Sequence, residues 1–312
     1  MVQVAGEREQ RAKVGMFGIG LEAYWEQFDG LKERLEGYQQ SVEEWIGQWA
    51  TVVSPGLVDT AQKAYAAGER FAEERVDLIF CHAATYATSS QVLPAVQEAG
   101  VPVVVLNLQP TPSLDYENTD TGEWLANCSA CCVPEISNAF ERAAIPFNVV
   151  SGTLHEDESA WTEIEEWCRA ATAVGTLRGS RFGFLGHTYP GMLDIYSDFT
   201  MHHAQLGLRV EVLEMDDLHD RVEDVAKEKV AAKLDETRET FEVDESVDEE
   251  DLEWSAQVSA GLDRLAEDFD LDALAYYYRG RTAASTSGSA PVSYWATPCS
   301  PRAVSRPPGR AT

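Results

Sequence analysis

Acidic residues are absent from the end of this chain, since none occurs after Asp272. All 53 Asp and Glu residues come earlier, and the segment 281–312 consists mainly of Ser, Thr, Ala, Pro and Arg. A segment without periodic apolar residues buries too little surface to offset the entropy lost on ordering. We therefore expect a disordered tail at 281–312, and a folded part that ends near Gly280.

Long apolar runs and a basic surface are also lacking. No run approaches the roughly 18 apolar residues of a membrane span, and 1–13 has no apolar core like that of a secretion signal. We therefore expect a cytoplasmic protein with no membrane partner and a disordered N-terminal extension at 1–13. Lys and Arg number 24, which gives a net charge of −29, and such a chain repels the phosphates of nucleic acids.

Cysteine is scarce, with six residues in a chain of 312. Without a secretion signal, they do not suggest a disulfide framework. Cys128 and Cys131 form a CxxC motif, but no second Cys/His pair stands at a zinc-like spacing, and the motif does not open a helix of a thioredoxin-like unit. We interpret these cysteines as structural thiols, and a metal or redox site is the alternative.

Short β-branched runs alternate with long amphipathic stretches, a pattern typical of βαβ units with parallel sheets. The expected strands are 14–20, 51–53, 78–81, 101–108 and 147–150, and then 181–186, 210–213 and 273–278. The expected helices are 24–49, 58–74, 92–98, 135–144, 157–176, 193–206, 219–240 and one ending at 268, and 109–127 is expected to be irregular. The predicted fold class is α/β, with two Rossmann-like doubly wound parallel-sheet domains in tandem. The first spans 14–178, and the second, incomplete, spans 179–280.

Ligands of doubly wound sheets bind beyond the carboxyl ends of the strands, so the loops after the strands hold the candidate residues. The loop Gly18–Ala23 fits the GxGxx(G/A) dinucleotide fingerprint formally. However, the second predicted strand leads into Ser54-Pro55-Gly56, without an acid to hold a ribose. This disfavours a nucleotide-dependent oxidoreductase.

Polar side chains follow two further predicted strands. His82, Thr85 and Tyr86 could hydrogen-bond a polyhydroxylated ligand, or the segment could be a helix cap at Ser89 or Ser90 beside a buried histidine. His187 begins a similar polar loop with Met192 as an apolar neighbour. No GxSxG motif is present, so a serine nucleophile has no support.

Three of these loops carry longer motifs: Gly-Leu-Glu-Ala-Tyr-Trp-Glu-Gln-Phe at 20–28, His-Ala-Ala-Thr-Tyr at 82–86, and Gly-His-Thr-Tyr-Pro-Gly-Met-Leu-Asp-Ile-Tyr-Ser-Asp-Phe-Thr at 186–200. In this order and spacing they resemble the L-arabinose isomerase family and, more broadly, L-fucose/L-arabinose isomerase-like proteins. The resemblance implies two Rossmann-like domains before a catalytic domain, usually in a hexamer. It also implies arabinose catabolism by aldose–ketose interconversion through a cis-enediol, with Mn²⁺ polarising the sugar.

The resemblance also implies which residues contact a sugar such as L-arabinose: Leu21, Glu22, Tyr24, His82, Thr85, Tyr86, Asn127, His187 and Met192. The metal ligands of the family lie beyond the matched part, where this chain has the acid-free segment 281–312. We therefore expect a truncated, inactive chain without catalytic or metal-ligating residues, whose tail is translated out of frame. The alternative is a non-catalytic sugar-binding or assembly module.

Overall fold

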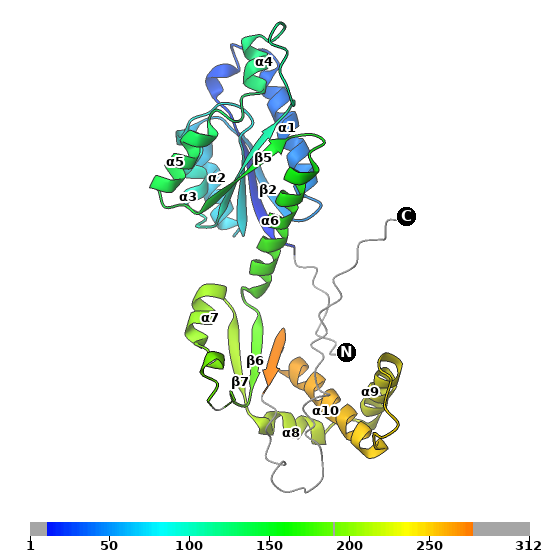
Figure 1. Cartoon of the computed structure of the whole chain (residues 1–312). Coiled ribbons are helices and arrows are strands. Elements are labelled where there is room, and N and C mark those ends of the chain that lie inside the picture. The colour runs from blue at the N-terminus through cyan, green and yellow to red at the C-terminus, as the bar shows by residue number, and fades with distance from the viewer. Residues whose placement is uncertain (1–10, 190, 277–312) are drawn as a thin grey trace. The chain divides into compact units, whose positions relative to one another are not determined.

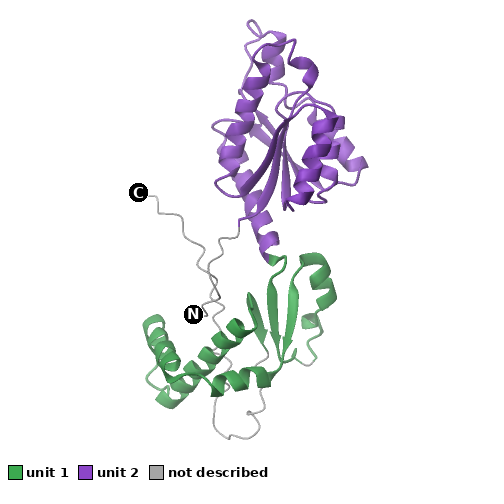
Figure 2. Cartoon of the chain, turned by 180° about the vertical axis from the view of Figure 1, so that it is seen from behind, with its two compact units in different colours: residues 1–8, 177–312 green, residues 9–176 purple. Residues whose placement is uncertain are grey.

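The computed structural model describes residues 11–189 and 191–276 (Figure 1). They form two compact units that divide between Thr176 and Leu177 (Figure 2). We call these the N-terminal unit, purple in Figure 2, and the C-terminal unit, green there, and describe each by itself. Most of the predicted extension 1–13 and all of the predicted tail 281–312 lie outside the described residues.

The N-terminal unit contains a parallel sheet of five strands in the order β2-β1-β3-β4-β5. The strands are β1 (Lys13–Ile19), β2 (Thr51–Val58), β3 (Leu78–His82), β4 (Val103–Gln109) and β5 (Phe147–Thr153). The α-helices are α1 (Leu31–Ile46), α2 (Ala61–Glu73), α3 (Leu93–Gln97), α4 (Thr121–Ala126), α5 (Val133–Arg142) and α6 (Glu158–Leu177). Short 3-10 turns lie at Glu22–Tyr24 and Ser89–Gln91.

Both faces of this sheet are covered by helices, as Figure 1 shows, with α2, α3 and α5 on one side and α1 and α6 on the other. Because successive side chains of a strand alternate between faces, Ile79 and Val105 join the core beneath α2, α3 and α5. Phe80 and Leu106 join the core beneath α1 and α6. The apolar central strands follow from this double burial, and the predicted α/β class with parallel sheets is confirmed.

Several element boundaries differ from the predictions. The first helix begins at Leu31, not near Tyr24, because Gly30 at the N-cap has a left-handed backbone with φ 78°. Within the stretch predicted to be irregular, α4 forms behind Asp120, whose side chain accepts a hydrogen bond from Glu123 N. Thr88, not Ser89 or Ser90, caps the turn after β3.

The C-terminal unit contains a three-stranded parallel sheet in the order β7-β6-β8. Its elements are β6 (Arg181–Leu185), a 3-10 turn (Leu193–Ile195), α7 (Phe199–Leu206), β7 (Arg209–Leu213), α8 (Met215–Glu223), α9 (Lys227–Thr240), α10 (Glu249–Asp268) and β8 (Ala273–Tyr276). The first strand of this unit, β6, lies between the second, β7, and the third, β8. In the N-terminal unit β1 lies between β2 and β3 in the same way. The two sheets therefore share the arrangement of their first three strands.

The helix predicted over 219–240 is two helices, α8 and α9. They bury different residues, since Leu218 and Val222 of α8 join the core of the C-terminal unit, whereas Val230 is the buried residue of α9. The change of direction falls at Ala226, whose backbone is extended. Over the described ranges, no helix combines the length and the apolar character needed to cross a bilayer.

Candidate functional site

Strand order places a candidate ligand-binding edge in the N-terminal unit. The chain runs from β1 to β2 on one side of β1, and β3 then pairs with its other side. The loops after β1 and β3 therefore leave the sheet in different directions, and ligands of doubly wound sheets bind where this happens. The residues of the first two motifs follow these two strands.

The loop after β1 is not built for a dinucleotide. A phosphate-binding glycine loop leads directly into a helix, whose N-terminal N–H groups hold the anion. Here a 3-10 turn follows, and α1 begins only at Leu31.

An acid does follow the second strand, contrary to the prediction, because β2 continues past Gly56 to Val58 and Asp59 comes next. Asp59 is buried, and its carboxylate accepts a hydrogen bond from Trp25 Nε1 at 2.9 Å and lies 2.7 Å from Lys63 Nζ. These internal partners occupy the acid that would otherwise hold a ribose.

The predicted residues of the first loop differ in exposure. Leu21 and Tyr24 are half-buried, and Glu22 is exposed. Burial raises the pKa of the Tyr24 phenol, and the neighbouring Tyr86 phenol and Cys132 thiol raise that pKa further. The structure therefore brings Tyr24, from the loop after β1, close to Tyr86, from the loop after β3.

The predicted residues of the third-strand loop have unequal access to a ligand. His82 is 1% exposed, and burial lowers the pKa of its imidazole to about 4. Its Nδ1 atom has no hydrogen-bond partner among the described residues. Thr85 is fully buried and donates from Oγ1 to Leu125 O at 2.7 Å, whereas Tyr86 is 38% exposed. Tyr86 alone of the three presents a substantial exposed surface.

Asn127 joins the end of α4 to the segment beyond β4. Its Oδ1 accepts a hydrogen bond from Thr111 Oγ1 at 2.8 Å, and its Nδ2 donates to Glu123 O at 2.9 Å and to Glu123 Oε1 at 3.1 Å. Glu123 forms a two-pronged ion pair with the Arg34 guanidinium, which is the main reason that the pKa of this carboxyl is lowered. The Asn127 side chain therefore links the Thr111 hydroxyl to the ion pair of Glu123 and Arg34.

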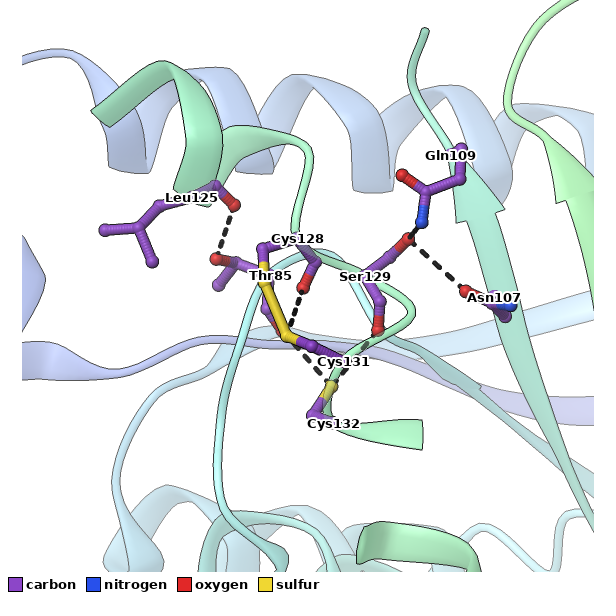
Figure 3. Close-up of a disulfide and its surroundings, with 8 residues drawn as sticks. All are labelled: Thr85, Asn107, Gln109, Leu125, Cys128, Ser129, Cys131 and Cys132. Atoms are coloured by element: carbon purple, nitrogen blue, oxygen red, sulfur yellow. Dashed lines mark hydrogen bonds between the residues drawn. A yellow bond between two sulfur atoms is a disulfide. The ribbon is translucent and has the colours of Figure 1, made fainter. Parts of the chain in front are cut away.

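Five polar residues of this edge were not predicted, and three of them, Asn107, Gln109 and Ser129, are drawn in Figure 3. Asn107 Nδ2 donates to Ser151 Oγ at 3.0 Å, and Asn107 Oδ1 lies 3.4 Å from Ser129 Oγ. With its amide oxygen toward Ala130 N and Ser129 Oγ, Gln109 accepts from both, and its amide nitrogen donates to Asn127 O at 2.8 Å. A row of polar contacts thus runs along the carboxyl ends of β4 and β5, and we call the six residues Asn107, Gln109, Thr111, Asn127, Ser129 and Ser151 the polar edge.

The interpretation of all cysteines as free structural thiols is wrong at one motif. Cys128 and Cys131 form a disulfide (Figure 3). Their Cα atoms lie 6.1 Å apart, within the span that a disulfide bridges. Among the described residues, Cys81, Cys132 and Cys168 are free and buried.

His187 and Met192 belong to the C-terminal unit, in the segment that follows β6. His187 is exposed, and Met192 is 47% exposed at the start of the 3-10 turn Leu193–Ile195. Their sugar-binding roles, like those of the other candidate residues, remain predictions.

Metal ligands are not gathered in the described part of the chain, where no three His, Cys, Asp or Glu side chains lie close enough to hold an ion. The resemblance places the Mn²⁺ ligands of the family beyond the matched part of this chain, so the expected Mn²⁺ stays a prediction. Two surface hollows also lie apart from the candidate residues: one of about 410 Å³ is lined by residues such as Leu93 and Arg142, and one of about 350 Å³ by residues of α9 and α10. Neither hollow includes a residue of the polar edge.

Comparison with known proteins finds no matching family model and no matching curated protein. Solved structures align with the chain at low similarity, among them three solute-binding proteins. An ABC transporter periplasmic solute-binding protein from Actinobacillus succinogenes 130z, with bound D-allose, is 15% identical over 68% of this chain and 64% of its own, with a TM-score of 0.26. This chain thus spans less than two thirds of the length of that protein.

The other two structures are also solute-binding proteins. A 5-methylthioribose transporter solute-binding protein from Thermotoga lettingae TMO, in complex with 5-methylthioribose, is 14% identical over 84% of this chain and 67% of its own, with a TM-score of 0.22. An ABC transporter solute-binding protein from Burkholderia multivorans, with an unknown ligand interpreted as α-D-erythrofuranose, is 12% identical over 88% of this chain and 82% of its own, with a TM-score of 0.24.

These findings correct the assignment based on the three motifs. No family model or curated isomerase matches, and the three solved structures are solute-binding proteins of transporters. Membership of the L-arabinose isomerase family, aldose–ketose isomerase activity and a role in arabinose catabolism are therefore wrong predictions. The expected hexamer and the cytoplasmic location are not tested by these findings.

Proposed function

We propose that this chain binds a small sugar without transforming it, at the polar edge of the N-terminal unit. The proposal rests on the geometry of this chain, and one observation carries it. Neutral amides and hydroxyls from β4, β5 and the segment after α4 form one row of polar contacts at the carboxyl ends of the strands.

The chemistry of these groups suits a polyhydroxylated ligand. Each sugar hydroxyl both donates and accepts a hydrogen bond, and amide and hydroxyl side chains also offer both functions. Groups held by one another keep a fixed direction, so a ligand loses less free energy in ordering them. The half-exposed side chain of Asn107 uses one N–H on Ser151, which leaves its second N–H for a ligand.

A charged group contacts the polar edge, and exposed aromatic residues lie on α4 and on the loop after β3. The side chain of Glu123 is 37% exposed. Its carboxylate is held by Arg34 and can only accept hydrogen bonds. Trp124 in α4 is 46% exposed, and Tyr86 is partly exposed. Exposed aromatic rings offer an apolar surface to the C–H faces of a sugar ring, while the polar edge takes its hydroxyls.

Calorimetric titration of the full chain with D-allose, D-ribose, L-arabinose and 5-methylthioribose tests the proposal. We expect at least one of these sugars to bind, and the Asn107→Ala variant to bind it about 5- to 10-fold more weakly, the loss of roughly one hydrogen bond. Asn138→Ala is the matched control, because Asn138 is exposed on α5 and lies outside the polar edge.

Two outcomes would contradict the proposal. One is the absence of heat for every sugar at millimolar concentration, and the other is equal affinity in the Asn107→Ala and Asn138→Ala variants. Conversion of the bound sugar to its ketose isomer, followed by NMR of the mixture, would contradict the non-catalytic part alone.

A further inference from the structure

The segment 127–132 joins α4 to α5 and carries two residues of the polar edge, Asn127 and Ser129. The Cys128–Cys131 disulfide closes a small ring within this segment (Figure 3). A bond across so few residues constrains the unfolded chain far less than a bond between distant residues. Its main effect is therefore local, on the shape of the segment that it closes.

The rest of the segment is held by hydrogen bonds that depend on this shape. Gln109 bonds to Asn127 O, Ser129 Oγ and Ala130 N, three successive contacts along the segment. Cys132 Sγ donates to Ser129 O at 3.3 Å and to Thr85 O at 3.6 Å, which ties the end of the segment to the loop after β3. The disulfide lies between these attachments and joins the residues beside Ser129 and Ala130.

The two cysteines of the disulfide differ in their exposure to solvent. Cys131 is exposed, whereas Cys128 is 6% exposed. The remaining described cysteines are buried, and burial raises the pKa of each thiol, well above its usual value for Cys81 and to about 12 for Cys168. Because the thiolate is the reactive form, Cys81 and Cys168 stay inert in the folded chain, while an external thiol can reach the disulfide at Cys131.

We propose that Cys128 and Cys131 form a reversible dithiol–disulfide pair that sets the order of the segment 127–132 and thereby controls the polar edge. The oxidised pair holds Asn127 and Ser129 against Gln109, and the reduced pair releases them. The consequence for ligand affinity rests on the proposed sugar binding, whereas the redox change and the loss of order do not.

The chemical step needs a dithiol reductant. One thiolate of the reductant attacks Cys131 Sγ, the bond between the two cysteines breaks, and Cys128 leaves as a thiolate that takes up a proton. The second thiolate of the reductant then attacks the reductant sulfur of the mixed disulfide, and Cys131 leaves as a thiolate and is protonated. The pair gains two electrons and two protons, and the reductant becomes a disulfide.

Hydrogen exchange and thiol mapping of the full chain test this inference without any sugar. The chain is equilibrated in buffers of oxidised and reduced dithiothreitol and then alkylated under native conditions. Peptide mass spectrometry separates Cys128 and Cys131 from the other cysteines, including Cys299, which lies outside the described residues. We expect Cys128 and Cys131 to become reactive together, and the amides of 126–131 to exchange about 10-fold faster after reduction.

Two variants define the controls. The Cys128→Ser/Cys131→Ser double variant should exchange fast over 126–131 in either buffer, and Cys168→Ala, which removes a buried thiol of α6, should respond to reduction as the wild type does. Wild-type exchange that is unchanged by complete reduction would overturn the proposal, as would a bond that excess reductant leaves intact in the folded chain.

Sugar titration in both buffers then separates the two proposals. Weaker binding in the reduced state supports control of the polar edge, and equal binding in both states overturns that control. If no sugar binds in either state, the proposed function fails, while the exchange measurements still decide whether the pair orders the segment.

Discussion

Replacement of Gly68 by alanine should lower the free energy of unfolding of the N-terminal unit by about 2 kcal/mol, net of the gain in helix propensity. Gly68 is buried in α2 where this helix crosses α3. A Cβ atom there would overlap Pro94 O and would lie 3.5 Å from Ala95 Cα. The obstacle is a backbone carbonyl, so relief requires the two helices to move apart.

Gly37→Ala is the matched control. Gly37 lies on the exposed side of α1, and no atom stands within 4 Å of its added Cβ. Removing a mid-helix glycine at such a site should raise the unfolding free energy by roughly 0.5–1 kcal/mol. Urea denaturation followed by tryptophan fluorescence measures both variants, and a Gly68→Ala variant as stable as Gly37→Ala would contradict the close packing of α2 on α3.

Acidification should destabilise the N-terminal unit through His82. Its pKa is lowered from 6.5 to about 4 by burial. Between these values the unfolded chain binds a proton that the folded chain does not, so stability is full above the unfolded pKa and is lost as pH falls toward the folded pKa. The loss attributable to this residue between pH 7 and pH 4 is about 3 kcal/mol.

His82→Phe isolates this contribution. The substitution keeps a ring of similar size beside Gly18 and Leu106, the strand neighbours of His82, and removes both the titrating group and an unpartnered buried nitrogen. We expect its unfolding free energy to change by about 3 kcal/mol less than that of the wild type over the same pH range. His155→Gln, at an exposed position, should retain the wild-type dependence. Parallel pH profiles for wild type and His82→Phe would contradict the account of His82.

The sheet could be predicted from the sequence because its central strands are buried on both faces. The run from Val103 to Leu108 is almost continuously apolar, and burial of alternate residues in two different cores explains why. The start of α1 was misplaced for a different reason. Trp25 and Phe28 have helical spacing and pack in one cluster with Leu31 and Leu35 of α1, but the left-handed backbone of Gly30 makes the helix begin after them.

The polar edge was harder to predict because it depends on contacts between distant segments. Asn107 and Gln109 lie in or at the end of an apolar strand, and their partners Ser129 and Asn127 come some twenty residues later. The Cys128–Cys131 disulfide was missed because scarce cysteines and the predicted compartment were given more weight than the CxxC spacing. The family assignment relied on three short motifs at strand ends, where a doubly wound domain places polar residues whatever its ligand.

Chemical-shift mapping of the full chain tests the sugar-binding claim most directly. The sugar with the highest affinity in the calorimetric panel is added to isotope-labelled protein, and the shifts of backbone and side-chain amides are followed to saturation. We predict that the largest changes fall on the amide groups of Asn107, Gln109 and Asn127. Saturable changes confined to other parts of the chain, or no change at millimolar sugar, would contradict a binding site at the polar edge.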